Sequence, residues 1–158
     1  MLILFVCTGN TCRSSMAGAV AGRLLEGRSE FQNVVIASAG VAAVAGQPAS
    51  REAVTALAEM GIDLNRHRAS QLTPEAVKQA DLVLTMTTAH QQHVQKLVPS
   101  EAQKVFTLAG YARVGGDIPD PIGQSLEAYC GCARRLMDLI GKVLDRLGAA
   151  SQGAGVFE

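Results

Sequence analysis

The five apolar residues Leu2–Val6 lead directly into the sequence Cys-Thr-Gly-Asn-Thr-Cys-Arg-Ser at positions 7–14. A short, continuous apolar run is typical of a strand that is buried on both faces, as in a parallel sheet. Gly9 and Asn10 tolerate positive φ and predict a tight loop after this strand, and Ser14 suits the start of a helix. This order of strand, tight loop and helix restricts the chain to an α/β fold, with the loop at the carboxyl end of a strand.

The rest of the chain repeats the alternation of short apolar runs and helical patterns, which predicts a parallel sheet with helices on both faces. We expect a single α/β domain over residues 1–148, built on a central four-stranded parallel sheet. Residues 149–158 are polar, contain glycine and lack periodicity, so they predict a flexible tail. The expected strands are 2–6, 34–38, 81–86 and 104–108, and the expected helices are 14–27, 50–60, a short one from 73, 88–98 and 125–147.

The charge balance excludes several classes of partner. The 158 residues include 14 basic and 14 acidic side chains, for a formal net charge of +0. This balance gives no field that would attract nucleic acid or an anionic membrane. The first apolar run is too short for a signal peptide, no stretch could span a bilayer, and four cysteines do not form a secreted disulfide framework. We therefore expect a cytoplasmic protein that binds neither nucleic acid nor membrane.

Cys7 and Arg13, separated by five residues, have the arrangement that a thiolate needs to attack phosphorus. Successive backbone N–H groups of the loop can surround a tetrahedral oxyanion, and the helix that begins near Arg13 adds its positive end. This environment favours the charged sulfur, and Arg13 can hold two phosphoryl oxygens in a planar, bidentate contact. The residues predicted to bind phosphate are Thr8, Gly9, Asn10, Thr11, Cys12, Arg13 and Ser14.

The loop sequence closely resembles the phosphate loop of the low-molecular-weight protein tyrosine phosphatase family. A second segment, Asp120-Pro121-Ile122-Gly123, is similar to the loop that carries the general acid of that family, and the resemblance extends from about residue 2 to residue 147. It implies a phosphatase that acts on phosphorylated proteins without a cofactor or a metal. Cys7 would attack the phosphoryl group, Arg13 would stabilise its charge, and Asp120 would protonate the leaving group and later activate water.

The resemblance also implies supporting residues around the loop. Asn10 and Ser38 look like the pair that holds the loop conformation through a side-chain hydrogen bond. Ser14 resembles the residue that donates to the sulfur of Cys7. His67 resembles a histidine that braces the loop from behind, and an ordinary surface histidine is the alternative for this position.

Thr11 and Ile122 bear on the choice of substrate. Typical tyrosine phosphatases of this family carry a bulkier aliphatic residue at the position of Thr11. They also carry aromatic residues after the Asp-Pro pair and in the loop of residues 41–44. The Thr11 hydroxyl could instead accept a hydrogen bond from a guanidinium N–H. The combination resembles the bacterial branch that removes phosphate from arginine residues of proteins, although that branch often has an aromatic where Ile122 stands. Phosphoarginine is the predicted substrate, and phosphotyrosine is the alternative.

Two further functions share this fold or this chemistry. A thioredoxin-coupled arsenate reductase would need resolving cysteines near the third strand, and residues 81–98 contain none. A non-catalytic phosphate-binding module would not need Cys7, Arg13 and Asp120 together. Asp117 competes with Asp120 for the acid role, but it lacks the match to the Asp-Pro pair.

The other cysteines and histidines are expected to be structural, with one exception. Cys130 and Cys132 are interpreted as packing or surface thiols. His90 and His93 are expected on exposed polar surface, because no third metal ligand is evident. Cys12 is the exception, since it lies five residues from Cys7 in one tight loop and could capture a sulfenic acid formed there. We predict this redox role for Cys12, with simple packing under the loop as the alternative.

Overall fold

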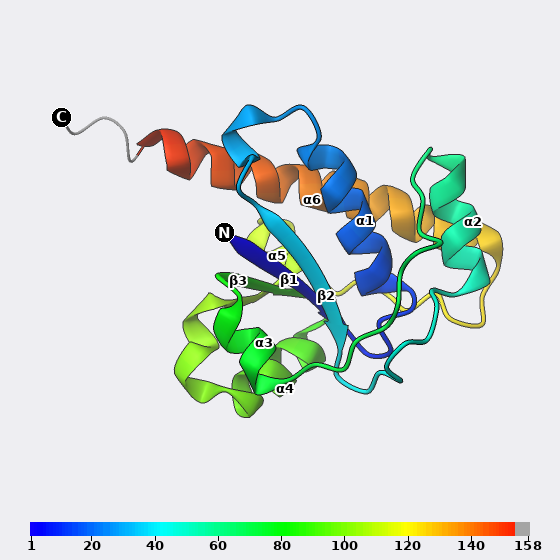
Figure 1. Cartoon of the computed structure of the whole chain (residues 1–158), viewed down its shortest axis with the longest axis horizontal. Helices are drawn as coiled ribbons and strands as arrows, with labels where there is room; N and C mark the ends of the chain where they lie inside the picture. The colour runs from blue at the N-terminus through cyan, green and yellow to red at the C-terminus, as the bar shows by residue number, and fades with distance from the viewer. Residues whose placement is uncertain (154–158) are drawn as a thin grey trace.

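Four parallel strands form the sheet in the order β2-β1-β3-β4, as Figure 1 shows. The computed structural model describes residues 1–153. β1 (Leu2–Cys7) pairs with β2 (Val35–Gly40) on one side and with β3 (Leu82–Thr85) on the other, and β4 (Val105–Thr107) pairs with β3 at the edge. The prediction of a four-stranded parallel sheet is therefore confirmed.

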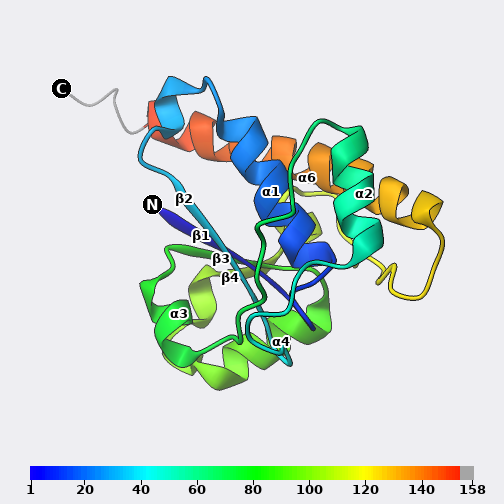
Figure 2. The same ribbon diagram turned by 45° about the vertical axis from the view of Figure 1, so that its right-hand side comes forward.

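Helices cover both faces of this sheet, as the sequence predicted. α1, α2 and α6 lie on one side, and α3 and α4 lie on the other (Figures 1 and 2). The sequence did not predict α5 or the two 3₁₀ turns, because elements of so few residues show no measurable periodicity. The bounds are α1 Arg13–Leu25, α2 Arg51–Glu59, α3 Pro74–Gln79, α4 Thr88–Leu97, α5 Leu108–Tyr111 and α6 Leu126–Gly153, with 3₁₀ turns at Ser29–Phe31 and Pro99–Lys104.

β1 is buried on both faces, which is the property that its continuous apolar sequence indicates. Ile3 and Phe5 pack into the core formed with α1, α2 and α6. Leu4 and Val6 pack into a second core formed with α3 and α4. A strand that is covered on both faces has no position for a polar side chain, so an apolar run marks it rather than an alternating pattern.

The starts of α2 and α3 follow capping residues that are visible in the sequence. Ser50 Oγ accepts a hydrogen bond from Ala53 N at 3.3 Å and caps α2. Thr73 caps α3 in the same way, with Pro74 in the first turn. These caps supply acceptors for backbone N–H groups that have no partner inside the helix.

α6 continues further than the sequence predicted. The expected end was residue 147, yet the helix runs through Gly153. Leu147 still packs against the core, and Gly148 lies next to Phe31, so packing extends past the point where the sequence pattern fades. Residues 149–153 of the predicted tail are therefore helical, and the rest of that tail lies outside the described residues. Within residues 1–153, no helix is both long enough and apolar enough to cross a membrane.

The strand order places the end of β1 at a topological switch point. The chain passes from β1 to β2 on one side and then crosses to β3 on the other side of β1. Open parallel sheets bind ligands at such a reversal, just beyond the carboxyl ends of the strands. Cys7 is the last residue of β1, so the loop that follows it occupies this position.

Candidate active site

Residues 7–14 form a tight loop that connects β1 to the first turn of α1. Asn10 has a φ of 57°, a conformation that asparagine tolerates better than most residues. Gly9 does not have a positive φ, so the conformational demand falls on Asn10 alone. The sequence predicted the tight loop correctly, but it indicated a positive φ at Gly9 as well as at Asn10.

The start of α1 leaves backbone donors available to an anion. The helix begins at Arg13, and its N-cap residue Cys12 makes no side-chain cap. Ser14 lies inside the first turn and does not cap the helix as its position in the sequence suggested, and Ser15 Oγ donates back to Cys12 O at 2.8 Å. No backbone N–H from Thr8 to Cys12 donates to an acceptor within residues 1–153. These donors and the helix end together suit a phosphoryl group.

The sulfur of Cys7 is in contact with the hydroxyl of Ser14. Sγ lies 2.8 Å from Ser14 Oγ, and that oxygen accepts a hydrogen bond from Asn10 Nδ2 at 2.8 Å. The hydroxyl hydrogen of Ser14 remains for the sulfur, since its other acceptor, Ala39 O, lies farther away at 3.5 Å. Ser14 Oγ is therefore positioned to donate to the sulfur of Cys7, and this is the pair of residues that the family resemblance placed in contact.

Asn10 connects the loop to two other segments of the chain. Its Nδ2 donates to Ser38 Oγ and its Oδ1 accepts from Ser70 N, each at 2.9 Å. His67 Nε2 donates to the carbonyl oxygen of Asn10 at 2.6 Å. Burial lowers the pKa of His67, which favours a neutral ring. The structure thus brings together Asn10, Ser38 and His67, the supporting residues that the sequence named.

Gly40, the last residue of β2, lies against the back of the loop. A Cβ at this position would overlap the carbonyl oxygen of Thr8 and lie 2.9 Å from Asn10 N. Both of these atoms belong to the backbone, so no side-chain rotation could relieve the overlap. The close approach of β2 therefore helps to set the shape of the loop.

We expect Gly40→Ala to lower the free energy of unfolding by about 1–3 kcal/mol, the usual cost of overpacking. The affinity for inorganic phosphate should fall with it, because the loop must move. Gly22→Ala in α1 is the matched control, since a Cβ there meets nothing within 4 Å. Urea unfolding and inhibition by phosphate would measure both effects, and equal stability of the two variants would contradict the assignment.

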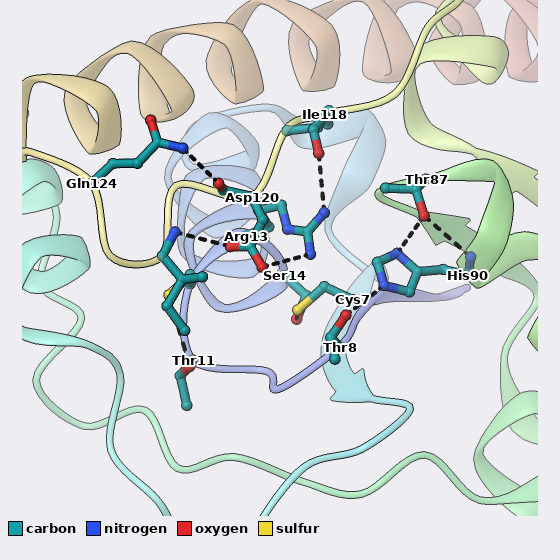
Figure 3. Close-up of polar contacts among 12 residues, drawn as sticks. Cys7, Thr8, Thr11, Arg13, Ser14, Thr87, His90, Ile118, Asp120 and Gln124 are labelled. Atoms are coloured by element: carbon teal, nitrogen blue, oxygen red, sulfur yellow. Dashed lines mark hydrogen bonds and ion pairs between the residues drawn. The ribbon is translucent and has the colours of Figure 1, made fainter.

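Arg13 joins the loop to the segment that contains Asp120 (Figure 3). It is 5% exposed, its Nη1 donates to Ile118 O at 3.0 Å, and its Nη2 lies 3.3 Å from Asp120 Oδ2. Ile122 N donates to Asp120 Oδ1, and Gln124 Nε2 donates to Asp120 O, each at 3.1 Å. The predicted nucleophile loop and the predicted acid loop therefore meet, although more than a hundred residues separate them in the sequence.

A cavity of about 130 Å³ lies between these two loops. It is smaller than the roughly 300–1,000 Å³ of typical ligand pockets, which suits a phosphoryl group rather than a whole cofactor. Cys7 and Arg13 are buried, whereas Thr8, Asp120 and Ile122 are exposed and form the mouth. Its lining residues are Cys7, Thr8, Gly9, Thr11, Cys12, Arg13, Asp120 and Ile122.

Cys12 is buried beneath the loop. Its Sγ lies 3.4 Å from Ser50 Oγ and 3.5 Å from Tyr129 OH. Burial, together with the contact to Cys12, raises the pKa of Tyr129 to about 12, so this phenol keeps its hydrogen. Cys7 and Cys12 are both free thiols in the structure, and the redox role of Cys12 stays a prediction.

His90 corrects the sequence interpretation. It was expected on exposed surface, but it is 7% exposed and its Nε2 lies 2.8 Å from Thr8 Oγ1 in the loop. Its Nδ1 lies 3.0 Å from Thr87 Oγ1 (Figure 3). Burial lowers the pKa of His90 to about 4, and the charge of Arg13 acts in the same direction, so the ring is neutral at pH 7. No local sequence pattern marks this contact. His90 comes close to Thr8 because β3 pairs beside β1 and the following helix, α4, is thereby carried to the loop.

Asp117 and the thiols of Cys130 and Cys132 are not among the groups that line the cavity. Asp117 Oδ1 accepts hydrogen bonds from Thr88 N at 2.9 Å and Thr88 Oγ1 at 3.1 Å, at the start of α4. Cys130 Sγ lies 3.2 Å from Glu59 Oε2, and burial raises the pKa of Cys132 to about 11. His93 is exposed. In the part of the chain that the structure describes, no three His, Cys, Asp or Glu side chains are grouped to hold a metal.

Comparison with known proteins agrees with this geometry. Residues 2–152 match the family described as low molecular weight phosphotyrosine protein phosphatase. A protein-arginine-phosphatase of Geobacillus stearothermophilus is 42% identical over 146 residues, which cover 92% of this chain and 95% of that protein. A probable low molecular weight protein-tyrosine-phosphatase, EpsP of Ralstonia nicotianae, is also 42% identical, over 127 residues that cover 80% of this chain and 82% of that protein.

One solved structure bears directly on the loop. It is the YwlE arginine phosphatase, in which a cysteine-to-serine mutant has a phosphorylated active site serine. The two structures superpose with a TM-score of 0.87 at 42% identity, and the match covers 93% of this chain and 95% of that one. Relatives named for arginine and for tyrosine thus have the same identity to this chain, and the arginine phosphatase matches it over the longer stretch.

Proposed function

The chain belongs to the low molecular weight phosphotyrosine protein phosphatase family and is a phosphatase, and from this we propose that it removes phosphate from arginine residues of proteins. Thr11 carries the proposal. Thr11 lines the cavity and carries a hydroxyl, and none of the described residues that line the cavity is aromatic. A guanidinium group offers only N–H donors, so a wall with hydroxyl acceptors suits it better than it suits a phenol ring.

The first step of the proposed reaction is attack by the Cys7 thiolate on phosphorus. Backbone N–H groups of the loop and the Arg13 guanidinium would stabilise the equatorial oxygens, while Ser14 holds the sulfur. A bound dianion would compete with the Asp120 carboxylate for Arg13, which frees Asp120 to face the leaving group. That carboxyl would then donate its proton to the departing nitrogen.

The second step is hydrolysis of the cysteinyl phosphate. Asp120, now a carboxylate, would accept a proton from water as the water oxygen bonds to phosphorus. The S–P bond breaks, and its electron pair returns to the sulfur of Cys7. The phosphorylated active site serine in the YwlE mutant supports such a covalent route.

A direct comparison of two peptides tests the substrate. Peptides that carry phosphoarginine or phosphotyrosine in the same flanking sequence should differ in kcat/KM in favour of phosphoarginine. Phosphotyrosine is the second candidate, because the EpsP relative, named as a probable tyrosine phosphatase, is also 42% identical to this chain, over a shorter stretch than the arginine phosphatase. A wild-type preference for the phosphotyrosine peptide would overturn the proposal and leave that candidate in its place.

Thr11→Ile should reverse the preference. The larger side chain fills the space beside the cavity and deletes the hydroxyl, so kcat/KM for phosphoarginine should fall by about 10- to 100-fold, as when a polar contact is lost. Activity on phosphotyrosine should rise relative to it. Thr11→Ser, which keeps the hydroxyl, is the matched control and should retain the wild-type order of substrates.

A further inference from the structure

The two ring nitrogens of His90 have different partners, and counting hydrogens assigns their roles. Thr87 Oγ1 accepts a hydrogen bond from the backbone N–H of His90 at 3.2 Å, which is the N-cap contact of α4. Its own hydroxyl hydrogen is then free to be donated to a further acceptor. Within residues 1–153, the acceptor in reach is His90 Nδ1 at 3.0 Å.

With Thr87 as the donor to Nδ1, the ring proton lies on Nε2. Because the ring is neutral, it carries one N–H, and an Nδ1 that accepts from Thr87 leaves that N–H on Nε2. Nε2 then donates to Thr8 Oγ1 at 2.8 Å. Thr8 Oγ1 has no other hydrogen-bond partner in the described part of the chain, so its own O–H stays available to the cavity that Thr8 lines.

The position of Thr8 matches the path of the second reaction step. Attack in line with the S–P bond brings water from the side opposite Cys7, which is the mouth of the cavity. Thr8 and Asp120 are both exposed at this mouth. A cavity of about 130 Å³ equals a sphere roughly 6 Å across, so one water can contact groups on two of its walls.

We propose that Thr8, held by the relay Thr87–His90–Thr8, positions the water that hydrolyses the cysteinyl phosphate. This inference rests on the covalent route of the proposed function, but not on the choice between arginine and tyrosine. The Thr8 O–H donates to one lone pair of the water, Asp120 takes one of its protons, and another lone pair bonds to phosphorus. The S–P bond breaks, and the products are inorganic phosphate and the Cys7 thiolate. His90 acts through Thr8 and is a positioning residue.

The test separates the two steps by rapid kinetics with p-nitrophenyl phosphate. Nitrophenolate release reports formation of the intermediate, and steady-state turnover reports its hydrolysis. Thr8→Val should lower kcat about tenfold, the worth of one hydrogen bond in the transition state. The burst rate and the Ki of phosphate should stay within about twofold, because the backbone N–H groups that would bind the phosphoryl group remain in the variant. Thr8→Ser should restore kcat.

The following results would contradict the proposed role of Thr8. An unchanged kcat, or a burst rate that falls as much as kcat, would show that Thr8 does not act on the water. An altered Ki for phosphate would assign its hydroxyl to the phosphoryl group instead. The absence of a burst in the wild type, together with turnover by Cys7→Ser, would overturn the covalent route of the proposed function. That result differs from the results that contradict the role of Thr8 alone.

A double-mutant cycle tests the relay. His90→Phe should lower kcat by a similar factor in the wild type and have no further effect in the Thr8→Val background. Additive losses would show that His90 does not act through Thr8. His93→Ala, at an exposed position of the same helix, is the control and should leave both phases unchanged. If the buried His90 variant does not fold, Thr8→Val and Thr8→Ser at the exposed position still decide the water-positioning role.

Discussion

Cys7→Ser should reduce turnover by about 10⁴-fold or more, since removing a catalytic nucleophile costs nearly as much as removing the whole catalytic group. A serine hydroxyl keeps its proton at neutral pH and is a far weaker nucleophile than a thiolate. The contact with Ser14 at 2.8 Å would then join two hydroxyls rather than a hydroxyl and a sulfur. Hydrolysis of p-nitrophenyl phosphate measures the loss.

Binding of inorganic phosphate by the Cys7→Ser variant should change by no more than about threefold, because the backbone donors of the loop and the end of α1 remain in place. Isothermal titration with phosphate separates this binding from catalysis. Cys130→Ser is the matched control, because that thiol lies outside the cavity and contacts Glu59. Substantial turnover by the Cys7 variant would remove Cys7 from the role of nucleophile.

Asp120→Asn should lower kcat by about 10²–10⁴-fold on substrates with poor leaving groups, which is the usual worth of a general acid. The carboxyl group lies beside Arg13 at the mouth of the cavity, where it could reach a leaving group. The effect should be smaller for p-nitrophenyl phosphate, because nitrophenolate departs without a proton. A series of aryl phosphates with increasing leaving-group pKa would measure this dependence.

Asp117→Asn is the control for the acid assignment. Its carboxylate is engaged with Thr88 at the start of α4, so the substitution removes a helix contact and should change kcat by less than about threefold. The two aspartates lie three residues apart, and only the Asp120 variant should show a slope against leaving-group pKa. Equal losses on all substrates, or a larger loss from Asp117→Asn, would move the acid role away from Asp120.

The fold was predictable from the sequence because its main features depend on local patterns. The apolar run Leu2–Val6 is long enough for one strand and contains no polar residue, which requires cover on both faces. Ser50 and Thr73 mark helix starts through their own side chains. Each of these signals lies within a few residues of the structure that it produces, so no distant contact is needed to interpret it.

The end of α6 was not predictable in this way. Residues 149–153 have no apolar period, but they continue a helix whose preceding turn still packs against Phe31 and the core. A helix that is already formed extends at low cost, since each added residue gains a hydrogen bond without a new nucleus. The contact that sustains the helix comes from a segment more than a hundred residues earlier.

The sequence by itself determined the loop and the alternation of strands and helices along the chain, and it predicted the residues that would attack, bind or protonate a phosphoryl group. Only the tertiary structure decided the contacts between segments: Arg13 with Ile118 O and Asp120, and Gly40 behind the loop. His90 is the clearest case, because its burial against Thr8 depends on β3 pairing beside β1 and carrying α4 to the loop. The chemistry of a side chain follows from the residue type alone, whereas proximity between distant residues depends on how the whole sheet and its helices pack.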